Sequence, residues 1–150
     1  MKAVIQRVSG ASIVINGGKP LSTGKGLVVL LGVARGDTAE ESERLARKIA
    51  AMRIFTDSEG RMNRSVTDIE GDLLIVSQFT LTADTRKGNR PSFNAAAPPE
   101  EAVPLYNHFV KSIKQLAPAE VQTGEFGAHM QITLTNDGPV TILLDTRAKE

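Results

Sequence analysis

The chain of 150 residues is 41% hydrophobic, carries a formal net charge of +1 and contains no cysteine. This composition predicts one globular domain over residues 1–150, and it excludes a disordered chain, a disulfide scaffold and thiolate or Cys-based metal chemistry. The near-neutral charge gives no global electrostatic case for binding a long nucleic-acid duplex.

The first third of the chain predicts strands. Residues 2–8 and 11–15 are rich in Val and Ile, and Ser9-Gly10 separates them, so we expect two strands. Residues 26–33 form a continuous apolar run, which predicts a strand buried on both faces. The opening residues lack the apolar region and cleavage site of a signal peptide, and no apolar run is long enough to span a bilayer, so we expect a cytoplasmic protein.

A helix is predicted next. Asp37 is of the residue type that caps helix N-termini, and Glu40, three residues later, would complete a capping box. The apolar stripe of Leu45, Ile49 and Met52 predicts that this helix runs to about residue 52.

The middle of the chain predicts a long strand, a loop and a second helix. Residues 73–81 are mostly apolar and predict the strand, and the loop covers about residues 82–98. Pro99 suits the first turn of the second helix. The apolar stripe of that helix consists of Ala102, Tyr106, Phe109, Ile113 and Leu116.

The C-terminal region predicts a hairpin. Residues 128–135 alternate apolar and polar side chains, and residues 140–144 are expected to pair with them across a tip that contains Asp137, Gly138 and Pro139. Together, these elements predict an α+β domain with a mixed, mostly antiparallel and barrel-like sheet and two main helices.

Side chains typical of catalysis are few. His108 and His129 lack the spacing of a metal-binding pair, and the chain has no Gly-x-Ser-x-Gly nucleophile elbow. We therefore predict neither a metal site nor an α/β-hydrolase triad. The polar groups best suited to a site are Ser77, Gln78 and Thr80 at the end of the strand at 73–81, because strand ends that open onto loops often carry binding groups. The same pattern is also typical of a solvated strand end.

Two strings of residues carry a resemblance to a known family. Ser77-Gln78-Phe79-Thr80-Leu81 and Asn136-Asp137-Gly138-Pro139-Val140-Thr141 closely resemble the two motifs of the D-aminoacyl-tRNA deacylase family. Further segments that resemble the family, in the same order along the chain, are residues 1–9, 26–33, 88–93 and 126–130.

The resemblance implies an enzyme that needs no cofactor. It would hydrolyse the ester between a D-amino acid, or glycine, and the 3′-terminal adenosine of tRNA. It would act as a homodimer, in which a cis Gly138–Pro139 peptide of one subunit enters the site of the other and rejects L-amino acids. The reaction would use the ribose 2′-hydroxyl, while the protein supplies orientation and electrostatics.

The resemblance also implies roles for individual residues. The expected catalytic residues are Ser77, Gln78, Phe79 and Thr80. We discount Thr80 as a nucleophile, because no base is placed to activate it. The residues expected to bind substrate are Phe126, Ala128, Met130, Asn136 and Arg7, of which Phe126 and Met130 would line the adenosine pocket and Arg7 would hold the Gly-Pro segment.

Two other hypotheses remain open at this point. A nucleic-acid-binding module would bind through the basic cluster of Arg86, Lys87 and Arg90, which has only Asp84 nearby as an acid. A structural dimer without chemistry would leave the polar end of the strand at 73–81 unexplained. Met130 has an alternative role as well, because it belongs to the apolar face of its strand.

Overall fold

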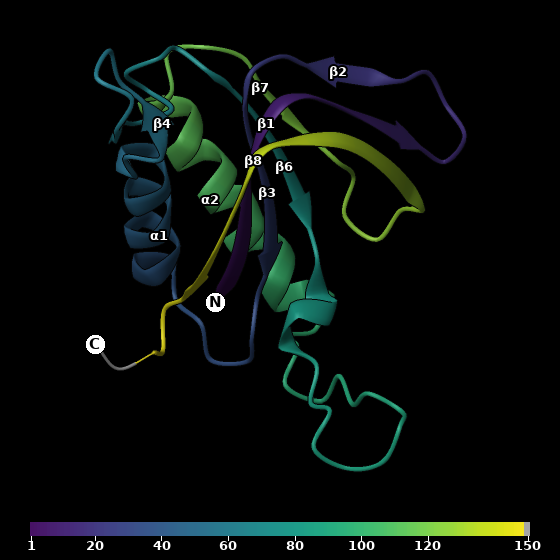
Figure 1. Ribbon diagram of the computed structural model, residues 1–150. Helices are drawn as coiled ribbons and strands as arrows, with labels where there is room; N and C mark the ends of the chain where they lie inside the picture. The colour runs from purple at the N-terminus through teal and green to yellow at the C-terminus, as the bar shows by residue number, and fades with distance from the viewer. Residues whose placement is uncertain (149–150) are drawn as a thin grey trace.

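The longest strands, β1 (Lys2–Ile15) and β8 (Met130–Asp145), run antiparallel along each other. In the computed structural model, which describes residues 1–148, the other edge of β1 pairs with β3 (Gly26–Gly32) and then with β2 (Leu21–Thr23), again antiparallel. Strand β1 therefore holds three neighbours in place and lies at the centre of the sheet (Figure 1).

The sheet continues from β3 through two parallel pairings. Strand β3 pairs with β6 (Asp72–Ser77), and β6 pairs with β7 (Val121–Thr123). The turn after β7 then approaches β8, because a side chain at Gly124 would collide with the Met130 sulfur. The predicted α+β fold with a mixed, mostly antiparallel and barrel-like sheet is confirmed, and the barrel is nearly closed.

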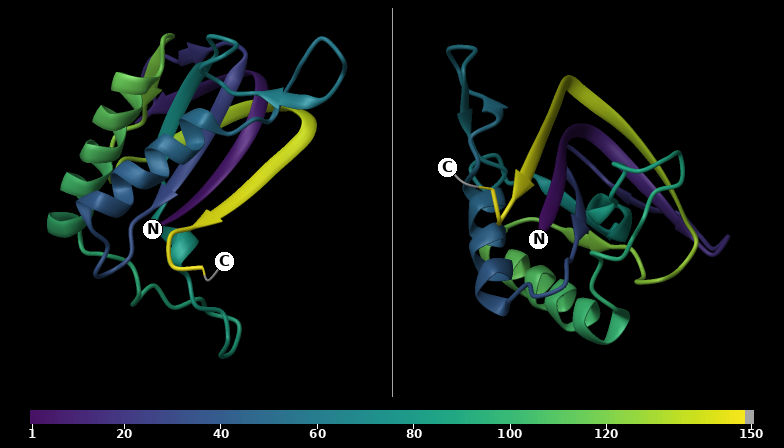
Figure 2. Two further views of the ribbon diagram at one scale, coloured as in Figure 1. Left: turned by 90° about the vertical axis from the view of Figure 1, so that its left-hand side faces the viewer. Right: turned by 90° about the horizontal axis from the view of Figure 1, so that it is seen from below.

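Two helices, α1 (Ala39–Ala51) and α2 (Pro99–Leu116), lie side by side on one face of the sheet (Figure 2). The core between the helices and the sheet includes Leu45, Ile49, Phe109 and Ile113 from the helices and Ile5, Leu27, Leu73 and Ile75 from the strands. The other face of the sheet curls around a second cluster that includes Val8, Ile13, Val28, Leu74 and Val76. Strand β3 is thus buried on both faces, as its continuous apolar sequence predicts.

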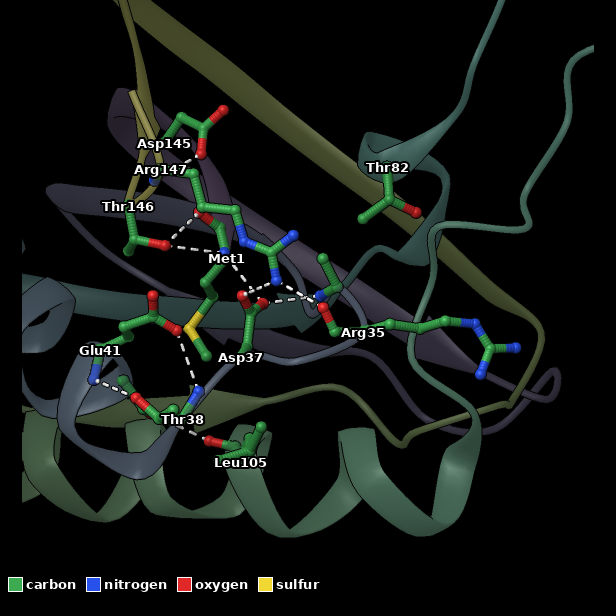
Figure 3. Close-up of polar contacts among 12 residues, drawn as sticks. Met1, Arg35, Asp37, Thr38, Glu41, Thr82, Leu105, Asp145, Thr146 and Arg147 are labelled. Atoms are coloured by element: carbon green, nitrogen blue, oxygen red, sulfur yellow. Dashed lines mark hydrogen bonds and ion pairs between the residues drawn. The ribbon is translucent and has the colours of Figure 1, made fainter. Parts of the chain in front are cut away.

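The helix predicted from Asp37 begins one residue later than expected. The N-cap is Thr38, whose hydroxyl accepts a hydrogen bond from the Glu41 N–H, while the Glu41 carboxylate accepts one from the Thr38 N–H. The carboxylate of Asp37 is buried and has other partners (Figure 3). It accepts a hydrogen bond from the Ala34 N–H, and it lies 2.8 Å from the N-terminal ammonium and 2.9 Å from the Arg147 guanidinium.

Two predicted strand boundaries are wrong for the same reason. Residues 2–8 and 11–15 form one strand, because β8 pairs with both segments and Ser9-Gly10 produces only a shift in register. The strand predicted over 73–81 ends at Ser77, because its neighbour β3 ends at Gly32. A short 3₁₀ helix, η1 (Phe79–Thr82), follows it. In both cases a neighbouring strand, and not local propensity, sets the boundary.

The predicted C-terminal hairpin is also wrong. The two segments expected to pair with each other belong to one strand, and both pair with β1 along the same edge. Between the pairs Val8–Asn136 and Gln6–Thr141, β1 contributes Arg7 alone, whereas β8 contributes residues 137–140. The Asn-Asp-Gly-Pro segment is therefore a bulge within a continuous strand.

The remaining strands, β4 (Phe55–Thr56) and β5 (Met62–Arg64), form a separate two-stranded ladder. Helix α2 begins at Pro99 as predicted, although Leu116 at its end is 41% exposed. None of the helices formed by residues 1–148 is long and apolar enough to cross a membrane.

The start of β3 gives a first test of the packing. A Cβ at Gly26 would lie 1.8 Å from the Asp72 carbonyl oxygen, which belongs to the paired backbone of β6 and cannot move away. We expect Gly26→Ala to lower the free energy of unfolding by about 3 kcal/mol in urea titrations. Gly10→Ala is the matched control, because a Cβ there would make only an ordinary contact of 3.6 Å with Thr23. Equal stabilities of the two variants would contradict this packing.

Candidate functional site

A polar corner, which we define as residues 77–80, lies at one end of the sheet. The parallel strands β3, β6 and β7 end at the same edge, so the residues that follow them gather there. Ser77 is the last residue of β6, and residues 78–80 follow it. The turn at 124–129, which contains Phe126 and Ala128, follows β7. A hydrogen bond of 3.0 Å from the Gly124 N–H to the Ile75 carbonyl joins that turn to β6.

Hydrogen bonds fix the conformation of the polar corner. The Gln78 N–H donates to the Leu31 carbonyl at 2.8 Å, and the Gln78 amide donates to the Thr80 hydroxyl at 2.5 Å. No hydrogen bond formed within residues 1–148 uses the N–H of Phe79 or of Thr80, the first two residues of η1. The corner therefore presents two adjacent backbone donors beside an ordered amide and hydroxyl, and none of these groups is ionisable.

Aromatic rings support the corner from two sides. The Phe79 ring packs edge-on against Phe93, with centroids 5.3 Å apart. The Phe126 ring lies 6.3 Å from the buried Tyr106, whose hydroxyl donates to the Ile75 carbonyl at 3.0 Å. Burial of the Tyr106 side chain raises its pKa to about 12.

A second group of predicted residues surrounds the bulge in β8. The Arg7 side chain is only 13% exposed, and its Nε donates to the Asp137 carbonyl at 2.8 Å. Its Nη1 donates to the Ile54 carbonyl, also at 2.8 Å. The Gly138–Pro139 peptide bond is cis, and Gly138 has a φ of +145°, which favours glycine.

Asn136 closes this bulge from inside. Its Oδ1 accepts a hydrogen bond of 2.8 Å from the Val140 N–H, and its Nδ2 donates to the Thr141 hydroxyl at 3.0 Å. The side chain of Asn136 thus spans residues 137–140 and links the two parts of β8. Sequence reasoning placed Asn136 in the motif but did not find this bracing role, which depends on the bulge.

Within one chain, the polar corner and the bulge in β8 lie far apart. Arg7 pairs with Leu27 near the start of β3, whereas Gln78 bonds to Leu31 near its end. Four residues of a strand span roughly 13 Å. The bulge with Gly138 and Pro139 therefore lies well away from the polar corner of its own chain.

Of the other predicted binding residues, Phe126 and Met130 contact the core. Phe126 packs against the main cluster through Tyr106, and Met130 packs against the second cluster beside Ile13. Ala128 lies in the turn, where its N–H donates to the Glu125 carbonyl. Sequence reasoning also missed the contact between Phe93 and Phe79, although Phe93 lies in one of the segments that carry the resemblance.

Other candidate features of the described chain lie elsewhere. A cavity of about 560 Å³ lies between α1 and the end of β8, and its lining includes Arg44, Lys48 and Leu143. His108 forms a 3.0 Å contact with Glu43 between the two helices. Among residues 1–148, no three His, Asp or Glu side chains are placed to hold a metal ion.

Comparison with known proteins identifies the family. The family described as D-Tyr-tRNA(Tyr) deacylase matches residues 4–145. The chain belongs to this family. The predicted family is therefore confirmed, as is the expectation of a hydrolase of this class.

The relatives match over nearly their whole length. A D-aminoacyl-tRNA deacylase from Akkermansia muciniphila is 54% identical over 150 residues, which is 100% of both chains. One from Roseiflexus castenholzii is 58% identical over 146 residues, which cover 97% of this chain and 92% of the relative.

Two solved structures share the fold. The structure of c-Myc DNA Unwinding Element Binding Protein has a TM-score of 0.92 and 44% identity, with 99% of this chain and 100% of that chain covered. A probable eukaryotic D-amino acid tRNA deacylase has a TM-score of 0.81 at 20% identity, with 95% and 97% covered, which shows the similarity of the fold alone.

The buried tyrosine gives a pH-dependent test. Tyr106 is the single tyrosine of the chain, which has no tryptophan, so ultraviolet absorbance of tyrosinate reports it alone. We expect its titration midpoint at a pH of about 12 in the folded protein, compared with 10.0 for an ordinary tyrosine. A midpoint near 10 in protein that is still folded would contradict the burial of the Tyr106 side chain.

The same shift predicts how stability depends on pH. The folded state holds the Tyr106 proton more tightly than the unfolded state. The contribution of this group to stability is therefore complete below a pH of 10 and is lost as the pH rises towards about 12. The Tm of the unmodified protein should therefore fall as the pH rises from 10 to about 12, and Tyr106→Phe should lack the part of this fall that Tyr106 causes.

Proposed function

We propose that this protein hydrolyses the ester between a D-amino acid and the 3′-terminal adenosine of tRNA, and that it also accepts glycine. The observation that carries the proposal is the family match over residues 4–145, which includes both the polar corner and the bulge. We place this activity in the cytoplasm, where aminoacyl-tRNA is used. The substrate is the aminoacyl end of tRNA.

Hydrolysis of the aminoacyl ester depends more on the orientation of the substrate than on acidic or basic side chains. Water adds to the acyl carbon, the bond to the ribose 3′-oxygen breaks, and that oxygen leaves with a proton to give free D-amino acid and tRNA. The N–H groups of Phe79 and Thr80 are suited to receive the negative charge that develops on the acyl oxygen. The ribose 2′-hydroxyl next to the ester assists the water, so no protein nucleophile is required.

The contacts of Thr80 support a reaction without a protein nucleophile. Its hydroxyl accepts a hydrogen bond from the Gln78 amide, and an amide nitrogen cannot remove a proton. We therefore assign Thr80 and Gln78 to holding the substrate, with Ser77 at the end of β6 as part of the same corner. None of these residues forms a covalent intermediate in this proposal.

Selectivity comes from a second copy of the chain. Gly138 and Pro139 lie roughly 13 Å from the polar corner along the strand direction, so they are too far away to screen a substrate bound there. In a homodimer, the bulge of one subunit reaches the corner of the other and leaves no space for an L side chain. A clash of about 3 kcal/mol gives more than a hundredfold discrimination.

The remaining predicted residues have positioning or binding roles. Arg7 and Asn136 hold the bulge, through the Asp137 carbonyl and the Val140 N–H respectively. Because both polar ends of the Asn136 amide are occupied, its role in substrate binding is indirect. Phe126, Ala128 and Met130 line the place where the terminal adenosine binds.

Purified protein provides the direct test of the proposed function. We expect it to release D-amino acid and glycine from the corresponding aminoacyl-tRNAs and to leave L-aminoacyl-tRNA intact under the same conditions. Equal cleavage of the D and L esters would exclude the stereoselective mechanism. Cleavage of neither ester would exclude the proposed deacylase activity. Light scattering of the same sample should give the mass of a dimer.

The bulge gives a sharper prediction. A Cβ at Gly138 would lie 2.7 Å from the Val140 nitrogen and 2.8 Å from its Cγ2, so Gly138→Ala must displace the tip. A displacement of about 1 Å in a positioning element costs about a hundredfold in rate, and we expect kcat/KM for the D ester to fall by that amount.

Gly17→Ala is the matched control for this variant. Gly17 also has a positive φ, of +70°, but a Cβ there has nothing within 4 Å. It should keep its full D-ester activity. A Gly138→Ala enzyme that is fully active and still rejects L esters would show that the tip has no part in selection.

A further inference from the structure

A basic loop projects from the molecule directly beside the polar corner. Residues 85–91 are all exposed, and an antiparallel bridge between Asp84 and Ser92 closes the loop at its base. The two backbone hydrogen bonds of this bridge measure 2.8 and 2.9 Å. Figure 1 shows the loop after η1 extending away from both the helices and the sheet.

The loop carries one sign of charge. Arg86, Lys87 and Arg90 are its cations, and Asp84 is the single acidic residue between residues 73 and 99. The Arg86 guanidinium donates hydrogen bonds to the Asp84 carboxylate, with the closest contact at 2.6 Å, and this lowers the pKa of Asp84 to about 2. The Arg86 side chain is nevertheless 88% exposed, so Asp84 orients this cation and leaves it accessible.

The base of the loop is fixed to the body of the protein. The Arg35 N–H donates to the Ala95 carbonyl at 3.0 Å, and the Arg35 Nε donates to the Asn94 carbonyl at 2.9 Å. On the other side, Phe93 packs against Phe79 of the polar corner. The base of the loop is therefore fixed beside the groups that are proposed to bind the ester.

We propose that the loop at 85–91 binds phosphate groups of the acceptor end of tRNA through Arg86, Lys87 and Arg90. This inference rests on the proposed function. It names the part of the protein that contacts the RNA backbone beyond the terminal adenosine. Its local charge compensates for the near-neutral charge of the chain as a whole, which cannot attract RNA by itself.

The surroundings of the loop favour RNA over an acidic protein. Phe79 of the polar corner and Phe93 at the base of the loop are 51% and 40% exposed, and their rings contact each other. Exposed aromatic rings beside a basic segment are the combination that binds single-stranded nucleic acid, because unpaired bases stack on the rings while cations follow the phosphates. The acceptor end of tRNA supplies both unpaired bases and phosphates.

The test compares two substrates of the same enzyme. The variant Arg86→Gln/Lys87→Gln/Arg90→Gln and the unmodified protein are assayed on D-aminoacyl-tRNA and on a D-aminoacyl ester of adenosine, which has no phosphate. We expect KM for the tRNA ester to rise by about tenfold or more, with kcat and the activity on the adenosine ester changed by less than about twofold.

Salt dependence gives a second readout of the same contacts. Three phosphate contacts make binding roughly 20- to 40-fold weaker between about 50 and about 200 mM salt. The loop variant should lose this part of the salt dependence of KM for D-aminoacyl-tRNA. A merely structural role of the loop would not change the dependence on salt.

Matched controls separate the position of the charges from their number. Arg47→Gln/Lys111→Gln/Lys114→Gln removes three exposed cations from α1 and α2 and should leave KM for D-aminoacyl-tRNA unchanged. The double variant Lys87→Gln/Arg90→Gln keeps the Arg86–Asp84 pair. It should show about two-thirds of the triple variant's logarithmic rise in KM and melt at the same temperature as the unmodified protein.

The outcomes distinguish failure of this inference from failure of the proposed function. If the unmodified protein cleaves neither ester, the proposed function fails. If it cleaves both, and the loop variant has the same KM and salt dependence for the tRNA ester, the loop inference is overturned while the function stands. Loss of affinity for duplex DNA, with KM for D-aminoacyl-tRNA unchanged, would also overturn it.

Discussion

The pairing of β1 along both of its edges is the constraint on which the other features of this fold depend. Strand β1 fixes β8 on one edge and β3 on the other, so the direction and register of the sheet follow from it. Strand β3 in turn positions β6 and, through it, the polar corner. The register of β1 thus determines where both the corner and the bulge lie.

The proposed division of the site between two subunits follows from this register. Arg7 on β1 holds the bulge in the middle of the β1–β8 pair, near the start of β3. The polar corner forms beyond the other end of β3, because the parallel strands finish there. In the proposed dimer, each copy of the chain would contribute one part to each of two sites. The cations of the loop at 85–91 extend the corner outwards, so each subunit would combine RNA binding and chemistry at one end.

Much of the fold could be predicted from the sequence, because hydrophobic periodicity reports burial. The buried strand β3, helix α2 from Pro99 and the alternating faces of β8 all follow from it. The family motifs also indicated the residues of both groups. What the sequence pattern could not supply was the choice of neighbours. Asn, Asp, Gly and Pro have the same local preferences in a hairpin tip and in a bulge, and only the long-range pairing with β1 distinguishes the two.

The bulge also differs from a hairpin tip in how freely it can move. A hairpin tip is held by two strands that can twist and bend together, whereas residues 137–140 are fixed at both ends to the same neighbouring strand and braced across by Asn136. Little conformational freedom remains to be lost when such a segment meets another surface, so its binding carries a small entropic cost. The proposed steric filter would require this property, because a tip that moved aside for an L side chain could not reject it.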